Sequence, residues 1–278
     1  MKLQFSNRLM SSFLLTIDNA ILKQGEAFSS GSGRFYPISG NAYGLYIYAS
    51  PYRQLVNDAS ISGSVIVSGL YVSGNFVRPG QSGLVSLNVA EGLAYFSYQP
   101  TNVSGTFSVK EINVYLNSEP EEKLLFETKM SLKPKFPQII TGMGISQQSY
   151  PVVFLKPIDT HNEPLCFGGV DSKNYRLRAI VLAETQYQLT ATCNILENLA
   201  HRNVPLINVT GLPFDALGGY TGAPYNYTGA TGSVPDAAYL YVAQAKSSML
   251  MSARELNQLN PTIFPAFVDF ELWTIQGP

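Results

Sequence analysis

Charged side chains are scarce in this sequence: they make up 13% of 278 residues, about half the usual share. The net charge is −1, so the chain has no overall electrostatic attraction for nucleic acid or for an anionic membrane. A surface with few charges and many tyrosines is typical of one covered by neighbouring subunits, because interface centres are poor in charge and rich in aromatic residues. The composition therefore favours an assembly protein, although secreted β-proteins share it.

Long hydrophobic runs are also missing, and no stretch approaches the length of a membrane span. The first 19 residues, MKLQFSNRLMSSFLLTIDN, begin like a signal peptide. However, Ser11, Ser12 and Thr16 interrupt the apolar run, and no small-residue cleavage site follows. We therefore expect synthesis in a cytoplasm and no membrane partner.

Cysteine and histidine occur twice each. Cys166 and Cys193 are too few for a disulfide scaffold. His161 and His201 supply no close pair of zinc ligands. Cys193 falls on the apolar side of a predicted helix, where a buried, inert thiol is the usual outcome, so a Cys–His nucleophile is not expected. The sequence predicts neither a metal nor a cofactor.

Sequence signatures of catalysis are absent as well: there is no phosphate-binding G-x-x-x-x-G-K-[ST] loop and no G-x-S-x-G nucleophile elbow. Asp269 and Glu271 lie on one face of a predicted strand, where paired carboxylates can perform acid–base chemistry. A solvated or ion-paired strand face is the commoner role of such residues. We predict that the protein is not an enzyme; a hydrolase with an unfamiliar fold is a rival hypothesis.

The sequence is instead rich in short strands separated by turn residues. This pattern predicts a mainly β protein with a smaller α+β part, and an antiparallel β-sandwich or barrel domain over residues 1–132. Tight turns are predicted at 74–75 and 91–92, and helical periodicity is weak except at 13–23. The predicted strands of this half are 44–49, 64–68, 70–77, 84–89, 93–98, 106–116 and 123–130.

A proline- and lysine-containing linker at 133–137 (KPKFP) separates this half from a predicted α+β oligomerisation domain at 138–278. Here the apolar period changes from that of a strand, at 175–183, to that of a helix, at 185–201. The packing face predicted for this helix consists of Leu189, Cys193, Leu196 and Ala200. The other expected elements are a strand at 151–155, a loop at 157–163, and strands at 204–208, 238–251 and 264–275.

Residues 211–235 contain six glycines and three prolines and are longer than a usual connection. Tyr220, Tyr225 and Tyr227 lie in this segment and offer contact area at low entropic cost, as in recognition loops. We predict a loop that reaches a neighbouring subunit through these three tyrosines; a mobile surface loop is the alternative.

Two passages resemble virion proteins of tailed bacteriophages. YVSGNFVRPGQSGLVSLNVAEGLAYFSY, at 71–98, is similar to a hairpin module of such proteins. Residues 167–207 resemble the strand–helix–strand part of neck and tail-completion proteins, and the closing VDFELWTI is similar to their final strand. The resemblance implies a homo-oligomeric ring, acting as neck protein or tail terminator at the head–tail connector.

The leading hypothesis is therefore a non-enzymatic structural subunit of a tailed-phage virion, assembled in the host cytoplasm. Its partners would be further copies of itself and other neck or tail proteins, without specific nucleic-acid recognition. The alternative is a receptor- or glycan-binding β-protein, such as a fibre, baseplate or capsid-decoration protein, which would use exposed tyrosines.

Overall fold

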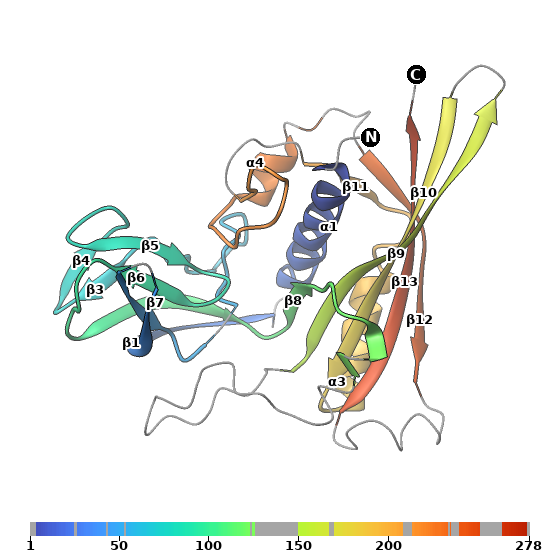
Figure 1. Ribbon diagram of the computed structural model, residues 1–278. Coiled ribbons are helices and arrows are strands. Elements are labelled where there is room, and N and C mark those ends of the chain that lie inside the picture. The colour runs from blue at the N-terminus through green and yellow to red at the C-terminus, as the bar shows by residue number, and fades with distance from the viewer. Residues whose placement is uncertain are drawn as a thin grey trace.

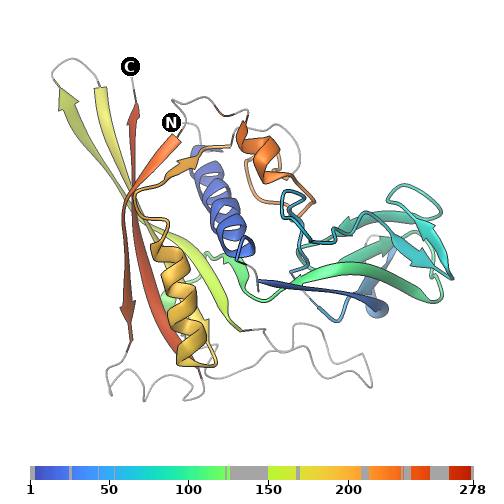
Figure 2. The same cartoon turned by 180° about the vertical axis from the view of Figure 1, so that it is seen from behind.

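Two β-sheets with one long helix between them make up the protein (Figures 1 and 2). The chain is mainly β, as predicted. The computed structural model describes residues 4–24, 27–42, 44–52, 54–122, 124–125, 150–166, 170–207, 213–232, 234, 239–250 and 263–276.

The first sheet has seven antiparallel strands in the order β4-β3-β7-β1-β2-β6-β5. The first half of β1 pairs with β7 and its second half with β2. The sheet curls on itself, so that apolar side chains from all seven strands fill one core that contains Phe35, Phe96 and Phe107. The strands are β1 (Phe28–Ala42), β2 (Leu45–Ala49), β3 (Leu70–Val72), β4 (Asn75–Val77), β5 (Leu84–Asn88), β6 (Leu93–Phe96) and β7 (Val103–Lys110).

The second sheet has six strands in the order β11-β12-β13-β10-β9-β8. All neighbours are antiparallel except β8, which runs parallel to β9. A long hairpin of β9 and β10 extends past the helices (Figure 1). The strands are β8 (Asn113–Leu116), β9 (Val152–Cys166), β10 (Val170–Ala183), β11 (Asn203–Pro205), β12 (Tyr239–Met249) and β13 (Phe264–Gln276).

Helix α1 (Gln4–Leu22) lies between the two sheets (Figure 2). Residues 9–19 are all buried. The polar side chains among them, Ser11, Ser12, Thr16, Asp18 and Asn19, are hydrogen-bonded, which permits their burial. The apolar partners of α1 belong to the second sheet; the ring of Phe13, for example, meets that of Phe270 edge-on at a centroid distance of 4.9 Å. Thus α1 and β8 both pack with the second sheet, although they precede the predicted linker at 133–137, which lies outside the described residues.

Several predictions of local structure are wrong. Residues 64–68 form no strand. The backbone N–H of Val65 donates to the side-chain hydroxyl of Ser108, and the Val65 carbonyl accepts from the Ser108 backbone N–H, but no strand pairing continues from there. The predicted loop at 157–163 is part of β9, whose polar sequence reflects exposure and not a turn. The predicted strand at 106–116 divides at 111–112, where the chain leaves the first sheet for the second.

Three further differences concern the N-terminal half. Strand β1 was not expected, because FSSGSGRFYPISGNA reads as a turn-rich segment; pairing on both edges makes it a strand. The turn predicted at 74–75 lies one residue earlier, at Ser73 and Gly74, which both have positive φ. Within the predicted strand at 123–130, residues 124 and 125 are helical and 126–130 lie outside the described residues.

Candidate functional site

Helix α3 (Gln186–Glu197) covers the second sheet next to α1, and Thr185 caps its first turn by accepting a hydrogen bond from the backbone N–H of Gln188. Of the predicted packing face, Leu189, Cys193 and Leu196 are buried against the sheet. Ala200 lies beyond the end of the helix and is half-buried, and the buried residue of that turn is Leu199.

The three tyrosines predicted to reach a neighbour turn their hydroxyls into their own chain. Tyr220 accepts a hydrogen bond from the side-chain amide of Asn57. The Tyr225 hydroxyl donates to Asp18 (3.3 Å), and the Tyr227 hydroxyl lies 3.0 Å from that of Thr16 in α1. Tyr227 also begins a short helix, α4 (Tyr227–Gly232). The segment is therefore held by α1 and the 54–61 loop.

A buried ion pair lies beneath these tyrosines. Lys110 Nζ, at the end of β7, is 2.8 Å from both carboxylate oxygens of Asp18 in α1. The two side chains are only 5% and 2% exposed. A second buried carboxylate, that of Asp58, accepts hydrogen bonds from the Asn19 side chain and from the backbone N–H of Tyr227. We call these groups, with the three tyrosines and Asn57, the junction.

The junction connects the two sheets through polar contacts that are shielded from water. Burial raises the pKa of Tyr225 well above its usual value of 10, and the negative charge of Asp18 raises it further. Tyr220 is shifted in the same direction, again mainly by burial. Both hydroxyls are protonated at neutral pH and act as hydrogen-bonding groups, so this arrangement supports structure and not nucleophilic chemistry.

Sequence reasoning missed the junction, because its members are far apart in the chain. A usable signal was present in LLTIDNAIL: a carboxylate inside an apolar helix requires a buried partner. The sequence does not reveal that this partner is Lys110.

One face of the second sheet is packed by α1 and α3. Among the described residues, helical residues 121–122 and 124–125 cover part of the opposite face, where Leu124 packs on Ile180 and Leu182. We call the exposed remainder of that face, around Arg176, Glu271 and Trp273, the open face.

Arg178 in β10 forms a bidentate ion pair with Asp269 in β13 (2.6 and 2.8 Å) and also contacts Glu121 at 3.0 Å. Arg176 lies 3.4 Å from Asp159 in β9 and 3.5 Å from Glu271 in β13. The expectation of an ion-paired strand face for Asp269 and Glu271 is thereby confirmed.

Aromatic side chains lie at one end of the open face. Trp273 is 49% exposed, and its cross-strand neighbour Tyr241 is 41% exposed. A shallow hollow of about 300 Å³ in this face is lined by Ile158 and by charged and amide side chains of β10, β12 and β13. A charged surface with exposed aromatic rings is suited to contact another macromolecule.

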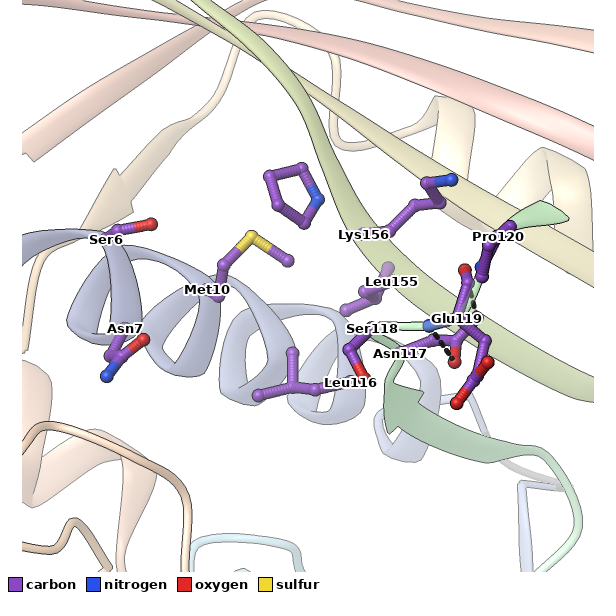
Figure 3. Close-up of a pocket in the computed structure, with 11 residues that line it drawn as sticks. Ser6, Asn7, Met10, Leu116, Asn117, Ser118, Glu119, Pro120, Leu155 and Lys156 are labelled. Atoms are coloured by element: carbon purple, nitrogen blue, oxygen red, sulfur yellow. Dashed lines mark hydrogen bonds between the residues drawn. The ribbon is translucent and has the colours of Figure 1, made fainter.

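A wider cleft of about 770 Å³ opens beside the N-terminal part of α1 (Figure 3). It is lined by Ser6, Asn7 and Met10 of α1, by residues 116–120, and by residues 155–157. Asn117 and Glu119 are hydrogen-bonded to each other across the connection after β8, and the Lys156 amine pairs with Glu121 at 3.3 Å. The lining offers amides and hydroxyls for contact but no nucleophile held next to a base.

Cys193, His161 and His201 lie in different surroundings. Burial, followed by the charge of Glu197, raises the pKa of the Cys193 thiol to about 11, so this thiol is protonated at neutral pH. The Nδ1 atom of His201 is 3.0 Å from the Tyr241 hydroxyl, and His161 is an exposed residue of β9, not of a loop. The described residues contain no group of three metal-ligating side chains, and none of their helices is long and apolar enough to span a bilayer.

Comparison with protein-family models gave no matching family, and a search of curated proteins gave no match.

Proposed function

We propose that the protein is a non-enzymatic structural subunit of a tailed-phage virion, and specifically a ring-forming neck or tail-terminator protein at the head–tail junction. The resemblance of 71–98 and 167–207 to phage virion proteins supports the biological setting. In this proposal the subunit is assembled in the host cytoplasm, becomes part of the virion, and contacts copies of itself and other neck or tail proteins.

The observation that carries the assembly function is the open face. One side of the six-stranded sheet is packed by α1 and α3. Leu124 and Leu125 cover part of the other side, whose remaining part presents Trp273, Tyr241 and Ile158 to solvent. Exposed apolar side chains next to polar ones mark protein–protein contacts, and an assembly would cover them. The oligomerisation unit of this proposal is built on the second sheet, which α1 and β8 join from the N-terminal half of the chain.

Mass photometry and negative-stain microscopy of the purified full chain test this function. We expect closed particles with several subunits. A protein that stays strictly monomeric at micromolar concentration contradicts the assembly function, whereas rings that bind purified tails or DNA-filled heads of the phage would establish the neck or terminator role.

A receptor- or glycan-binding protein is the second candidate, and exposed Trp273 favours it. An indole ring on a flat strand face, with Gln244 and Glu271 beside it, is a surface on which a sugar ring can stack and form hydrogen bonds. Under this hypothesis a monomer binds glycans, and Trp273→Ala abolishes the binding; no glycan binding by the wild type contradicts it.

A further inference from the structure

The two central strands of the open face carry charges of opposite sign. Arg176 and Arg178 project from β10, and their register partners in β13 are Glu271 and Asp269. One step further along, Asn174 of β10 pairs in register with Trp273 of β13. A basic strand therefore lies beside an acidic strand in the middle of the sheet.

This pattern is self-complementary. A two-fold axis that lies along the face, midway between β10 and β13, places β10 of each copy opposite β13 of the other. Arg176 then faces Glu271 of the second copy, and Trp273 faces its Asn174. Arg178 stays within its own subunit, where Glu121 covers it. Two sheets stacked in this way have nearly aligned strands, as in ordinary sheet-on-sheet packing.

We propose that the open face binds the open face of a second copy of this chain through these two strands. This contact would be one of the interfaces of the proposed assembly, so it rests on the proposed function: it requires that the chain associates with copies of itself. A strongly acidic or basic partner fits less well, since the acidic and basic groups of this face balance: the basic ones are Lys156, Arg176, Arg178 and Lys246, and the acidic ones are Glu121, Asp159, Asp269 and Glu271.

The geometry of Arg176 fits this role. Its contacts with Asp159 and Glu271 are 3.4 and 3.5 Å long, and its side chain is 53% exposed. Such loose pairs contribute little within one subunit, so the guanidinium is available to a second copy. Arg178, in contrast, is held by Asp269 at 2.6 Å and by Glu121 at 3.0 Å, and it stacks on the Phe267 ring.

A contact between two identical surfaces closes on itself. It produces a dimer, or joins two rings face to face, and it cannot alone extend into a ring. The native particle therefore contains an even number of subunits, and loss of this contact halves its mass.

Single charge-reversal substitutions in the full-length chain test the proposal, with the particle mass measured by mass photometry and light scattering. Arg176→Glu opposes Glu271 of the second copy with a like charge, twice by symmetry, and Glu271→Arg does the same to Arg176. We expect each variant alone to have half the wild-type mass, with at least about tenfold weaker association. An equimolar mixture of the two, and the double variant R176E/E271R, should recover the full mass. Arg34→Glu reverses the charge of an exposed residue of β1 in the first sheet. It is the matched control, and this variant should retain the wild-type mass.

The outcomes separate the two proposals. A wild type that assembles while R176E and E271R keep its full mass overturns the open-face contact and leaves the assembly function standing. A strictly monomeric wild type overturns both. Variants with halved mass that do not recover on mixing also overturn the contact. Circular dichroism and the unfolding midpoint establish that each variant is folded, and Trp273→Ala is a second, uncharged variant that should halve the mass.

Discussion

The junction and the open face use the same chemistry, pairs of acidic and basic side chains, in opposite surroundings. At the junction, Lys110 and Asp18 are almost completely shielded from water, whereas Arg176 and Asp159 on the open face are about half exposed. Breaking a buried pair leaves an uncompensated charge in a medium of low dielectric constant, while an exposed pair is readily replaced by water. The comparison indicates that the junction holds the subunit together and that the open face remains available for a partner.

The largest effect is expected from Lys110→Met. The substitution leaves the Asp18 carboxylate buried without its counter-ion and should lower the free energy of unfolding by about 3–5 kcal/mol. Urea denaturation followed by circular dichroism measures this. Lys246→Met, which removes an exposed lysine of β12, is the matched control and should change the free energy by less than about 0.5 kcal/mol. Equal effects of the two substitutions would contradict the contrast between the two regions.

Tyr225→Phe should have a smaller effect on the junction. It removes the hydroxyl that donates to Asp18 and should cost about 1 kcal/mol at neutral pH, whereas Tyr241→Phe on the surface should cost less. Because burial raises the folded-state pKa of Tyr225 well above 10, the stability associated with its protonated form is complete below pH 10 and is lost as the pH rises further. Unfolding free energies above pH 10 should therefore fall less steeply for Tyr225→Phe than for the wild type; identical slopes would contradict the assigned pKa shift.

The difference between the two regions also explains what the sequence could predict. Strands β10, β12 and β13 and helix α3 were predicted because each is more buried on one side over much of its length and therefore shows a period of two or of 3.6 residues; within β10, residues 179–183 are buried on both faces. The acidic residues of the open face could be assigned from the same alternation, since Asp269 and Glu271 lie on the polar side of a strand. Their basic partners were not assigned, because register between strands is not visible in one sequence.

The elements that escaped prediction depend on contacts between distant residues. Residues 9–19 of α1 are buried whether polar or apolar, so Ser11 and Ser12 interrupt the apolar period, and only 13–23 read as helical. Strand β1 depends on two neighbours that outweigh its glycines and serines. The tyrosines at 220, 225 and 227 were interpreted as surface contacts because tyrosine suits interfaces, but the buried carboxylates and amides around them decided their orientation.

Asp269→Asn tests whether the tighter ion pair of the open face, Arg178–Asp269, contributes less to stability than the buried pair of the junction. Arg178 keeps Glu121 and its stacking on Phe267 after this change, and its side chain is 23% exposed, so the expected cost is about 0.5–1 kcal/mol. Because salt screens exposed charges, the cost should shrink at about 1 M NaCl, whereas that of Lys110→Met should not. If the loss of unfolding free energy caused by Asp269→Asn does not depend on salt, this ion pair behaves like the buried pair of the junction.

Arg176→Met should have the smallest effect on the folded subunit and a large one on its assembly. The change removes two long, exposed ion pairs, so the free energy of unfolding of the dissociated subunit should change by less than about 0.5 kcal/mol. In the two-fold contact, the same change leaves Glu271 of each copy facing an apolar side chain in a desolvated interface, which weakens association. Dilution series by mass photometry, beside urea denaturation at a concentration where the wild type is dissociated, measure both quantities. If the variant instead unfolds more easily by several kcal/mol and assembles like the wild type, Arg176 stabilises the subunit, and the open face does not differ from the junction in the way inferred here.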